Sequence, residues 1–293
     1  MKRLIKRFAM VMAGAVMVSI LPVMAQDIAP VKTENKLSKE APVVAEKVIT
    51  KKETISVNGK TVELRLKIPA VPAPGMPWLW LGEFFGHLDR FENDLVAKGW
   101  HVAYAPLSNQ FGSPGAMASW DIVYQELHGK RGLSAKPALL GISRGALYAN
   151  AWIRLHPDRV SVLYLDNGVC DIRSWPGGFP LTATGNGSKG DWTLYKTVFG
   201  FSTDDEAIAK SVRPIDGLAP AIKAGVVLIS VHGTADMTVP YVDNAKNLVD
   251  LWEKSGGIAK VFPKEGGDHH PHGLPIKTDA YEQLVDMLCA IKQ

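Results

Sequence analysis

The segment that most constrains the fold is Gly141-Ile-Ser-Arg-Gly145, which lies between a short apolar run, 138–142, and a helical pattern over 145–156. Glycines lack a Cβ, so a strand and a helix can approach closely on either side of Ser143. Such a turn lifts the serine oxygen clear of the sheet. It also points the Arg144 N–H to where negative charge would form on a reacting group. The pattern predicts a strand–turn–helix unit with an accessible serine at its turn.

Strands and helices alternate along most of the chain. A hairpin is predicted over 53–68, with Asn58-Gly59 at its turn. Further strands are expected at 78–81, 100–105, 138–142, 160–165, 226–231 and 259–262. Helices are expected at 88–98, 116–129, 145–156 and 277–291. This alternation predicts an α/β fold, a mostly parallel doubly wound sheet with helices on both faces.

The N-terminus has the pattern of a cleavable signal peptide. Residues 1–7 are basic, 8–23 are almost entirely apolar, and Val23-Met-Ala25 suits a signal peptidase, so we expect cleavage after Ala25. The apolar run is short for a membrane span, and no cysteine follows the cleavage site to carry a lipid. The protein is therefore expected in the periplasm or secreted, with no stable membrane anchor. Residues 26–52, poor in aromatics and lacking periodicity, are expected to form a flexible linker.

The rest of the chain, 53–293, has the size of one α/β domain. The net charge of +4 includes the four basic residues of the signal segment, so the mature chain is near neutral. Charge therefore gives no support for nucleic-acid binding. An insertion rich in glycine turns and aromatics, at about 168–213, is expected to form a lid or substrate loop. Trp175 and Trp192 in it, and Trp120 outside it, are candidates for stacking on a sugar ring.

Three residue types in the order Ser, Asp, His each follow a predicted strand. A serine hydroxyl becomes nucleophilic when a base takes its proton, and an acid must orient that base. Ser143 is the candidate nucleophile, and Asp236, just past the strand at 226–231, is the candidate acid. Asp166, at the end of the preceding strand, is the rival acid. The base is expected from the loop after the last strand, with His269 first and His270 second.

His269, His270 and His272 are crowded into that loop, so a metal site is an alternative to a catalytic base. No cysteine accompanies the histidines, and Pro271 restricts how adjacent imidazoles converge, so we interpret the cluster as a base with supporting residues and predict no metal or other cofactor. Cys170 and Cys289 are capable of pairing in an oxidising compartment. Two buried free thiols are the interpretation we adopt.

Stabilising an oxyanion requires two donors. One is the main-chain N–H of Arg144, and the other is expected from the loop 82–87, through Glu83 or Phe84. The Arg144 side chain lies at a helix N-terminus, where a cation is unfavourable. Its guanidinium is therefore a candidate for reinforcing the oxyanion site or for binding a substrate carboxylate.

These motifs resemble the α/β-hydrolase superfamily over about residues 53–292. Phe84-Phe-Gly-His87, Gly112-Ser-Pro114, Trp175-Pro-Gly-Gly178 and His269-His-Pro-His272 are similar to exported bacterial hydrolases associated with polysaccharide breakdown. The Ser-Arg-Gly element is similar to that of glucuronoyl esterases, in which the arginine assists the oxyanion. Where a common hydrolase motif has glycine before the histidine, this chain has Asp268.

The resemblance implies a serine esterase that cleaves an acyl or methyl ester, with a small-molecule or carbohydrate ester as its partner. Two other functions share the same residues. One is a serine peptidase, although the chain has no added domain that would gate peptides. The other is a non-catalytic carbohydrate-binding module on a hydrolase fold.

Overall fold

The computed structural model describes residues 48–57, 59–183, 185–213 and 215–293. The expected signal peptide and nearly all of the expected linker lie outside this part of the chain. Within it, one eight-stranded sheet has the order β1-β2-β4-β3-β5-β6-β7-β8. The strands are β1 (Ile49–Val57), β2 (Lys60–Ile68), β3 (Trp78–Leu81), β4 (His101–Tyr104), β5 (Ala138–Ile142), β6 (Val162–Asp166), β7 (Val227–Gly233) and β8 (Ala259–Lys264).

The two ends of the sheet differ in strand direction. β1 and β2 form the predicted antiparallel hairpin, and β2 pairs antiparallel with β4. From β4 through β8 every pairing is parallel. Because parallel strands need crossover connections, helices must separate them in the sequence, and this explains the alternation that the sequence shows. The carboxyl ends of these strands lie together at one edge of the sheet.

Eight α-helices accompany the sheet in the described part of the chain. They are α1 (Asp89–Ala97), α2 (Pro114–Tyr124), α3 (Ala146–Leu155), α4 (Lys189–Phe199), α5 (Asp204–Lys210), α6 (Ala219–Lys223), α7 (Ala245–Lys254) and α8 (Asp279–Ala290). The helix expected over 116–129 continues past α2 as a π-helical segment, Gln125–Lys130. Among these residues no helix has the length and apolar character to cross a membrane.

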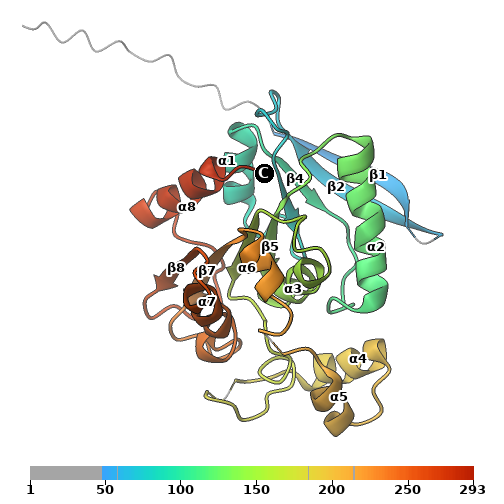
Figure 1. Cartoon of the computed structure of the whole chain (residues 1–293), viewed down its shortest axis with the longest axis vertical. Helices are drawn as coiled ribbons and strands as arrows, with labels where there is room; N and C mark the ends of the chain where they lie inside the picture. The colour runs from blue at the N-terminus through green and yellow to red at the C-terminus, as the bar shows by residue number, and fades with distance from the viewer. Residues whose placement is uncertain (1–47, 58, 184, 214) are drawn as a thin grey trace, which may run out of the picture. The chain divides into compact units, whose positions relative to one another are not determined.

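The helices cover both faces of the sheet, as predicted (Figure 1). Helices α1 and α8 pack against one face, where their apolar residues join Leu79, Leu140 and Tyr164 of the strands. Helices α2, α3, α6 and α7 cover the opposite face, against Trp80, Leu139 and other inward-facing residues. Successive strand residues thus alternate between two buried layers, which is why the central strands are continuous apolar runs.

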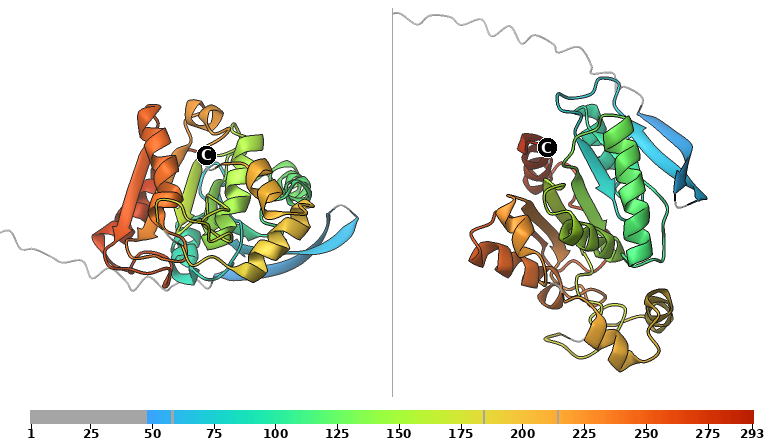
Figure 2. Two further views of the ribbon diagram at one scale, coloured as in Figure 1. Left: turned by 90° about the horizontal axis from the view of Figure 1, so that it is seen from below. Right: turned by 45° about the vertical axis from the view of Figure 1, so that its right-hand side comes forward.

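The segment after β6 forms the expected insertion, with α4 and α5 inside it. Figures 1 and 2 place these helices at one end of the sheet, beyond the helices that cover its faces. The aromatic residues of α4 and Ala207 of α5 pack with Phe111, Leu147 and Val239 in a separate apolar cluster. The insertion therefore has its own small core, which lies beside the edge of the sheet from which Ser143 emerges.

One predicted boundary needs correction. The linker was expected to end at residue 52, but β1 begins at Ile49, and Ile49 pairs with Ile68. Residues 49–52 have a weak hydrophobic pattern of their own, yet the neighbouring strand β2 supplies partners for their main-chain groups. Antiparallel pairing thus extends the hairpin beyond the segment in which side-chain alternation is visible.

Candidate active site

Ser143 lies in a strained turn directly after β5. Its φ is 47°, in the left-handed region that non-glycine residues rarely adopt. The close packing around the turn requires glycine. A Cβ on Gly145 would lie 2.9 Å from the Glu83 main-chain nitrogen, so the loop after β3 rests directly against the serine turn. The structure thus has the strand–turn–helix geometry predicted for Gly141–Gly145.

Ser143 Oγ is 3.0 Å from His269 Nε2, and His269 Nδ1 is 2.8 Å from Asp236 Oδ2. The Asp236 carboxylate can only accept a hydrogen bond, so Nδ1 carries the proton and Nε2 is left to accept from the serine hydroxyl. Both His269 and Asp236 are buried. The structure therefore brings together the three residues chosen as nucleophile, base and acid.

Asp236 is held in place by main-chain donors. Its second oxygen, Oδ1, accepts hydrogen bonds from the N–H groups of Thr238 and Val239, each at 2.8 Å. These bonds fix the carboxylate plane and leave Oδ2 directed at His269. The loop after β7 is thus folded around the acid. The same bonds satisfy the Asx-turn pattern that an aspartate in such a loop favours.

The rival acid, Asp166, is paired with a different histidine. Its Oδ1 is 2.9 Å from His272 Nδ1, and its Oδ2 accepts from the Gly273 N–H. Asp166 is fully buried at the end of β6. Two carboxylate–histidine pairs therefore lie side by side, one following β7 and one at the end of β6, and a single loop provides both histidines.

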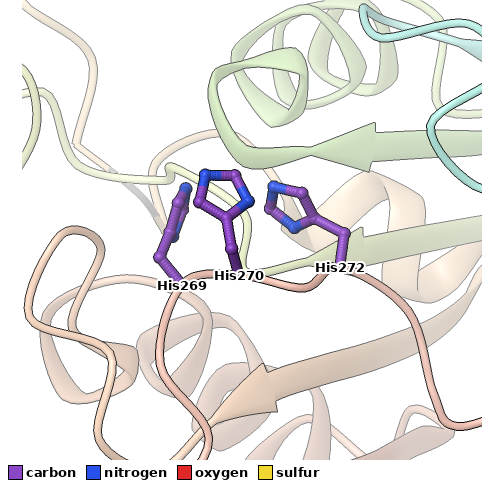
Figure 3. Close-up of side chains that lie close together, drawn as sticks. All are labelled: His269, His270 and His272. Atoms are coloured by element: carbon purple, nitrogen blue, oxygen red, sulfur yellow. The ribbon is translucent and has the colours of Figure 1, made fainter.

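His270, the second candidate for the base, is exposed between these two histidines. Figure 3 shows the three imidazoles rising from the loop after β8 on the same side. Their ring centroids are 4.9, 5.0 and 4.7 Å apart. The three imidazoles thus converge in spite of Pro271, so the expectation that this proline restricts their convergence is wrong. Partial burial and the neighbouring His272 and His269 lower the pKa of His270.

Asn167, which no sequence motif singled out, connects the ends of β6 and β7 to the loop after β8. Its side-chain N–H donates to the His269 carbonyl oxygen at 2.6 Å, and its Oδ1 accepts from the Gly233 N–H at 2.8 Å. Asn167 is buried and has a φ of 44°, which asparagine tolerates better than most residues. An asparagine directly after a strand-ending aspartate was the only signal in the sequence. We infer that it is a positioning residue for His269.

Glu83 and Arg144 form an ion pair beside the serine. Arg144 Nε donates to Glu83 Oε2 at 2.8 Å, and Arg144 Nη1 lies 3.4 Å from Asp191 of α4. The side chain of Glu83 is 3% exposed and that of Arg144 is 22% exposed. The guanidinium is thus engaged by two carboxylates and lies 5.5 Å from the Phe84 ring. It links the loop after β3 to the insertion, and its charge is already neutralised locally.

The three tryptophans expected to stack on sugar are all buried. Trp120 is 1% exposed and stacks on Trp80 at 4.1 Å in the core. Trp175 and Trp192 are 8% and 6% exposed and pack in the core of the insertion. A ring with so little exposed area offers no face to a ligand, so the prediction that these tryptophans stack on a sugar ring is wrong. Large aromatic rings stabilise a fold when they are buried, and these three rings pack in cores instead of forming a binding surface.

The cysteines also differ from the expectation. Both are free, but only Cys170 is buried, whereas Cys289 is exposed on α8. Burial raises the pKa of the Cys170 thiol to about 12, so this thiol is unreactive at neutral pH. The interpretation of two buried thiols holds for Cys170 and fails for Cys289.

Comparison with known proteins gives a match in structure but none in sequence. No family model matches, and no curated protein matches. Among solved structures, a puromycin-hydrolyzing peptidase of Mycobacterium tuberculosis superposes with a TM-score of 0.63 at 16% identity. The match covers 84% of this chain and 39% of that peptidase, so the chain spans about two fifths of its length.

Two further structures agree. A thermostable esterase from Pseudomonas putida has a TM-score of 0.57 at 17% identity, over 84% of this chain and 82% of that one. An acylaminoacyl peptidase from Pyrococcus horikoshii has a TM-score of 0.58 at 12% identity, over 76% and 38%. The chain has the α/β-hydrolase fold. At these identities the likeness concerns the fold, and the activity must be argued from the site.

Proposed function

We propose that this protein is a serine hydrolase that cleaves a carboxylic ester through an acyl-enzyme intermediate. The observation that carries the proposal is the continuous chain of hydrogen bonds from Ser143 through His269 to Asp236, at 3.0 and 2.8 Å. A nucleophile, a base and an orienting acid in this arrangement are the requirements of acyl transfer. Each residue lies just beyond the carboxyl end of a parallel strand, where α/β folds place their reactive groups.

In the proposed reaction, His269 Nε2 takes the Ser143 hydroxyl proton as Oγ attacks the acyl carbon. The resulting imidazolium is stabilised by Asp236, and it returns the proton to the departing alcohol. Water then enters and gives a proton to His269 as it attacks the acyl-enzyme. His269 passes that proton to Ser143 Oγ as the acid is released, which restores the serine. No cofactor is needed, because His269 carries the proton in both steps.

The tetrahedral intermediate would place its oxyanion near two main-chain donors. The first is the Arg144 N–H, at the start of the turn that precedes α3. The second is the N–H of Glu83 or of Phe84, because the Gly82 N–H is already donated to the Leu140 carbonyl oxygen. We infer that the Glu83–Arg144 ion pair acts by holding these two segments together. A guanidinium bound by two carboxylates is poorly placed to take a substrate carboxylate as well.

The substrate we favour is an acyl or methyl ester on a carbohydrate. The support is the resemblance of the loops to hydrolases associated with polysaccharide breakdown. With the three tryptophans buried, we propose Phe84 as the aromatic ring that contacts a sugar. This ring is half-buried in the loop after β3 and lies beside Arg144. We further propose that the protein is exported, with cleavage after Ala25, because of the signal-like segment at residues 1–25. Fractionation of cells and N-terminal sequencing of the product test that proposal.

Hydrolysis of p-nitrophenyl acetate tests the reaction, followed by release of acid or methanol from esterified polysaccharides. We expect turnover by the wild type and its loss in Ser143→Ala. Ser255→Ala, at an exposed position after α7, is the matched control and should retain the wild-type rate. Full activity in Ser143→Ala would overturn the proposal.

A peptidase is the second candidate, because two of the three structures compared above are named as peptidases. The same three residues would cleave an amide. Amino-acyl and peptidyl 7-amido-4-methylcoumarins distinguish the two activities. A larger kcat/KM on these amides than on the esters, lost in Ser143→Ala, would favour the peptidase. A protein that hydrolyses neither class of substrate, but whose migration is retarded by polysaccharide in affinity gel electrophoresis, would be the binding module.

A further inference from the structure

The loop after β8 presents three imidazoles with a common direction, and the proposed reaction uses one of them. His269, His270 and His272 each offer a ring nitrogen, and these nitrogens all lie within 4.8 Å of one another. His272 makes no contact with Ser143 in the hydrogen bonds of the described chain, yet its ring is as firmly held as that of His269. This duplication of an oriented histidine has no role in acyl transfer.

Both flanking histidines are oriented by a buried carboxylate. Asp236 binds Nδ1 of His269, and Asp166 binds Nδ1 of His272. In each ring the proton therefore sits on Nδ1, which leaves the lone pair on Nε2. A histidine that donates its other N–H to a carboxylate is the usual arrangement at protein metal sites, where the carboxylate fixes the ring and raises its basicity. Two histidines of this loop have such a partner, Asp236 after β7 and Asp166 at the end of β6.

The spacing of the rings suits one small ion. Around a single Zn²⁺, at Zn–N distances of about 2.0–2.1 Å, three imidazole centroids lie roughly 5 Å apart. The three centroids here are 4.7 to 5.0 Å apart, with interplanar angles of 79° to 81°. The nitrogens would lie roughly 3.4 Å apart at such an ion. The ring centres are therefore already at the separation that a shared ion requires, and the nitrogens have to approach from within 4.8 Å to roughly 3.4 Å.

The ring that is free to rotate is the middle one. Among the hydrogen bonds of the described residues none involves the imidazole of His270, and this residue is exposed. Figure 3 shows its ring between those of His269 and His272. Its neighbours are buried or partly buried and fixed by their carboxylates. Two of the three ligands are thus already oriented by carboxylates, and His270 is the ligand that has to move.

We propose that His269, His270 and His272 bind a late first-row divalent ion, represented by Zn²⁺, and that this ion switches the hydrolase off. Imidazole nitrogens are ligands that Zn²⁺, Cu²⁺ and Ni²⁺ accept. The ion takes the lone pair of His269 Nε2, which the free enzyme uses to accept the Ser143 proton. One lone pair serves one partner, so metal binding breaks the Ser143–His269 hydrogen bond and removes the base. The inhibitory part of this inference rests on the proposed function; the binding part does not.

Calorimetric titration of the purified protein with ZnCl₂ tests the binding. We expect one equivalent of Zn²⁺ on the wild type, and binding at least tenfold weaker in His270→Ala. Asp166→Asn, which removes the carboxylate behind His272, should weaken binding about 10- to 100-fold. His156→Gln, at the end of α3 and paired with Asp121, is the matched control and should bind as the wild type does. Circular dichroism melting of each variant establishes that it is folded.

Inhibition is measured separately, as the fraction of each variant's own metal-free rate. Zn²⁺ should inhibit the wild type, EDTA should restore it, and His270→Ala should need at least tenfold more Zn²⁺ for the same inhibition. Absence of binding, or binding unchanged in both His270→Ala and Asp166→Asn, overturns the site. Binding without inhibition of an active enzyme overturns the switch. A protein that binds Zn²⁺ and hydrolyses nothing retains the site and overturns the proposed function.

Discussion

A Cβ added to Gly82 would lie 2.2 Å from the carbonyl oxygen of Gly145. The loop after β3 and the turn that carries Ser143 are thus in direct main-chain contact, and no side chain fits between them. This contact sets the distance between the two segments that supply the proposed oxyanion donors. A separation fixed by backbone atoms cannot be restored by a change of rotamer.

Gly82→Ala is therefore expected to force the two segments apart. We expect a loss of about 1–3 kcal/mol in the free energy of unfolding and at least a hundredfold fall in kcat/KM for the ester. Gly190→Ala in α4 is the control, because a Cβ there meets nothing within 4 Å. Because Gly190 lies in the first turn of α4, this change should shift stability by no more than roughly 0.5 kcal/mol. Urea denaturation and ester hydrolysis measure both effects; wild-type kinetics in folded Gly82→Ala would contradict this account.

The two aspartates should differ in their effect on the reaction. Asp236→Asn leaves the geometry in place but removes the charge and disturbs the tautomer of His269, so we expect kcat to fall by about 10⁴. Asp166→Asn acts on His272, which does not touch Ser143, so its effect on kcat should be at least a hundredfold smaller. Steady-state kinetics of the two single variants, without added metal, give the comparison. Equal losses would mean that both pairs take part in the proton transfer.

The Glu83–Arg144 pair should show strong coupling in a double-mutant cycle. Arg144→Gln strands a carboxylate that is 3% exposed, and a broken buried pair costs about 3–5 kcal/mol. Because Arg144 is partly exposed, we expect the loss in the free energy of unfolding to lie at the lower end of this range. Glu83→Gln/Arg144→Gln should be more stable than the sum of the single losses predicts, by about 1–3 kcal/mol. Additive losses in urea denaturation would show that the two side chains act independently.

His232 should make the fold less stable in mild acid. Its imidazole lies in β7, stacks on Tyr241 at 3.5 Å, and has its pKa lowered from 6.5 to about 4, first by burial and then by Lys264. The unfolded chain therefore binds the proton more readily between pH 6.5 and 4. Stability from this group is complete above pH 6.5 and is lost as the pH falls towards 4.

His232→Phe keeps an aromatic ring against Tyr241 but cannot take a proton. The difference in unfolding free energy between pH 7.5 and pH 4.5 should therefore be smaller in this variant than in the wild type. Part of the dependence should remain, because burial also lowers the pKa of His101. Urea denaturation at the two pH values measures the difference. An identical pH dependence in both proteins would mean that His232 does not contribute.

The sheet was predictable because its central strands are buried on both faces and are therefore continuous apolar runs. The opening hairpin was visible from its alternation and from Asn58-Gly59. The helix α7 was not assigned, although Ala245, Leu248, Val249 and Trp252 have helical spacing. This helical spacing is visible in the sequence, but it lies in the long segment between two strong strand patterns and was not recognised.

The three residues of the candidate site were predictable because their order along the chain and their positions after strands are visible in the sequence. Ser143, Asp236 and His269 follow the carboxyl ends of β5, β7 and β8, and parallel pairing brings those ends together. The sequence left two candidate acids, Asp236 and Asp166, and the structure pairs each of them with a histidine. Asp166 pairs with His272, which is 106 residues away in the chain. Such a pairing depends on how the loop after β8 crosses the sheet edge, and no local pattern encodes that path. The burial of Trp120, Trp175 and Trp192 has the same cause, because packing in three dimensions decides which rings are covered.

The central claim is that His269 activates Ser143 as a nucleophile. Reaction with a fluorophosphonate probe, followed by intact mass and peptide mapping, tests it without knowledge of the substrate. We predict one adduct per chain, on Ser143, and no adduct on Ser143→Ala or His269→Ala, with Ser255→Ala labelled as the wild type is. A wild type that remains unlabelled, or labelling that persists in Ser143→Ala, would contradict the account.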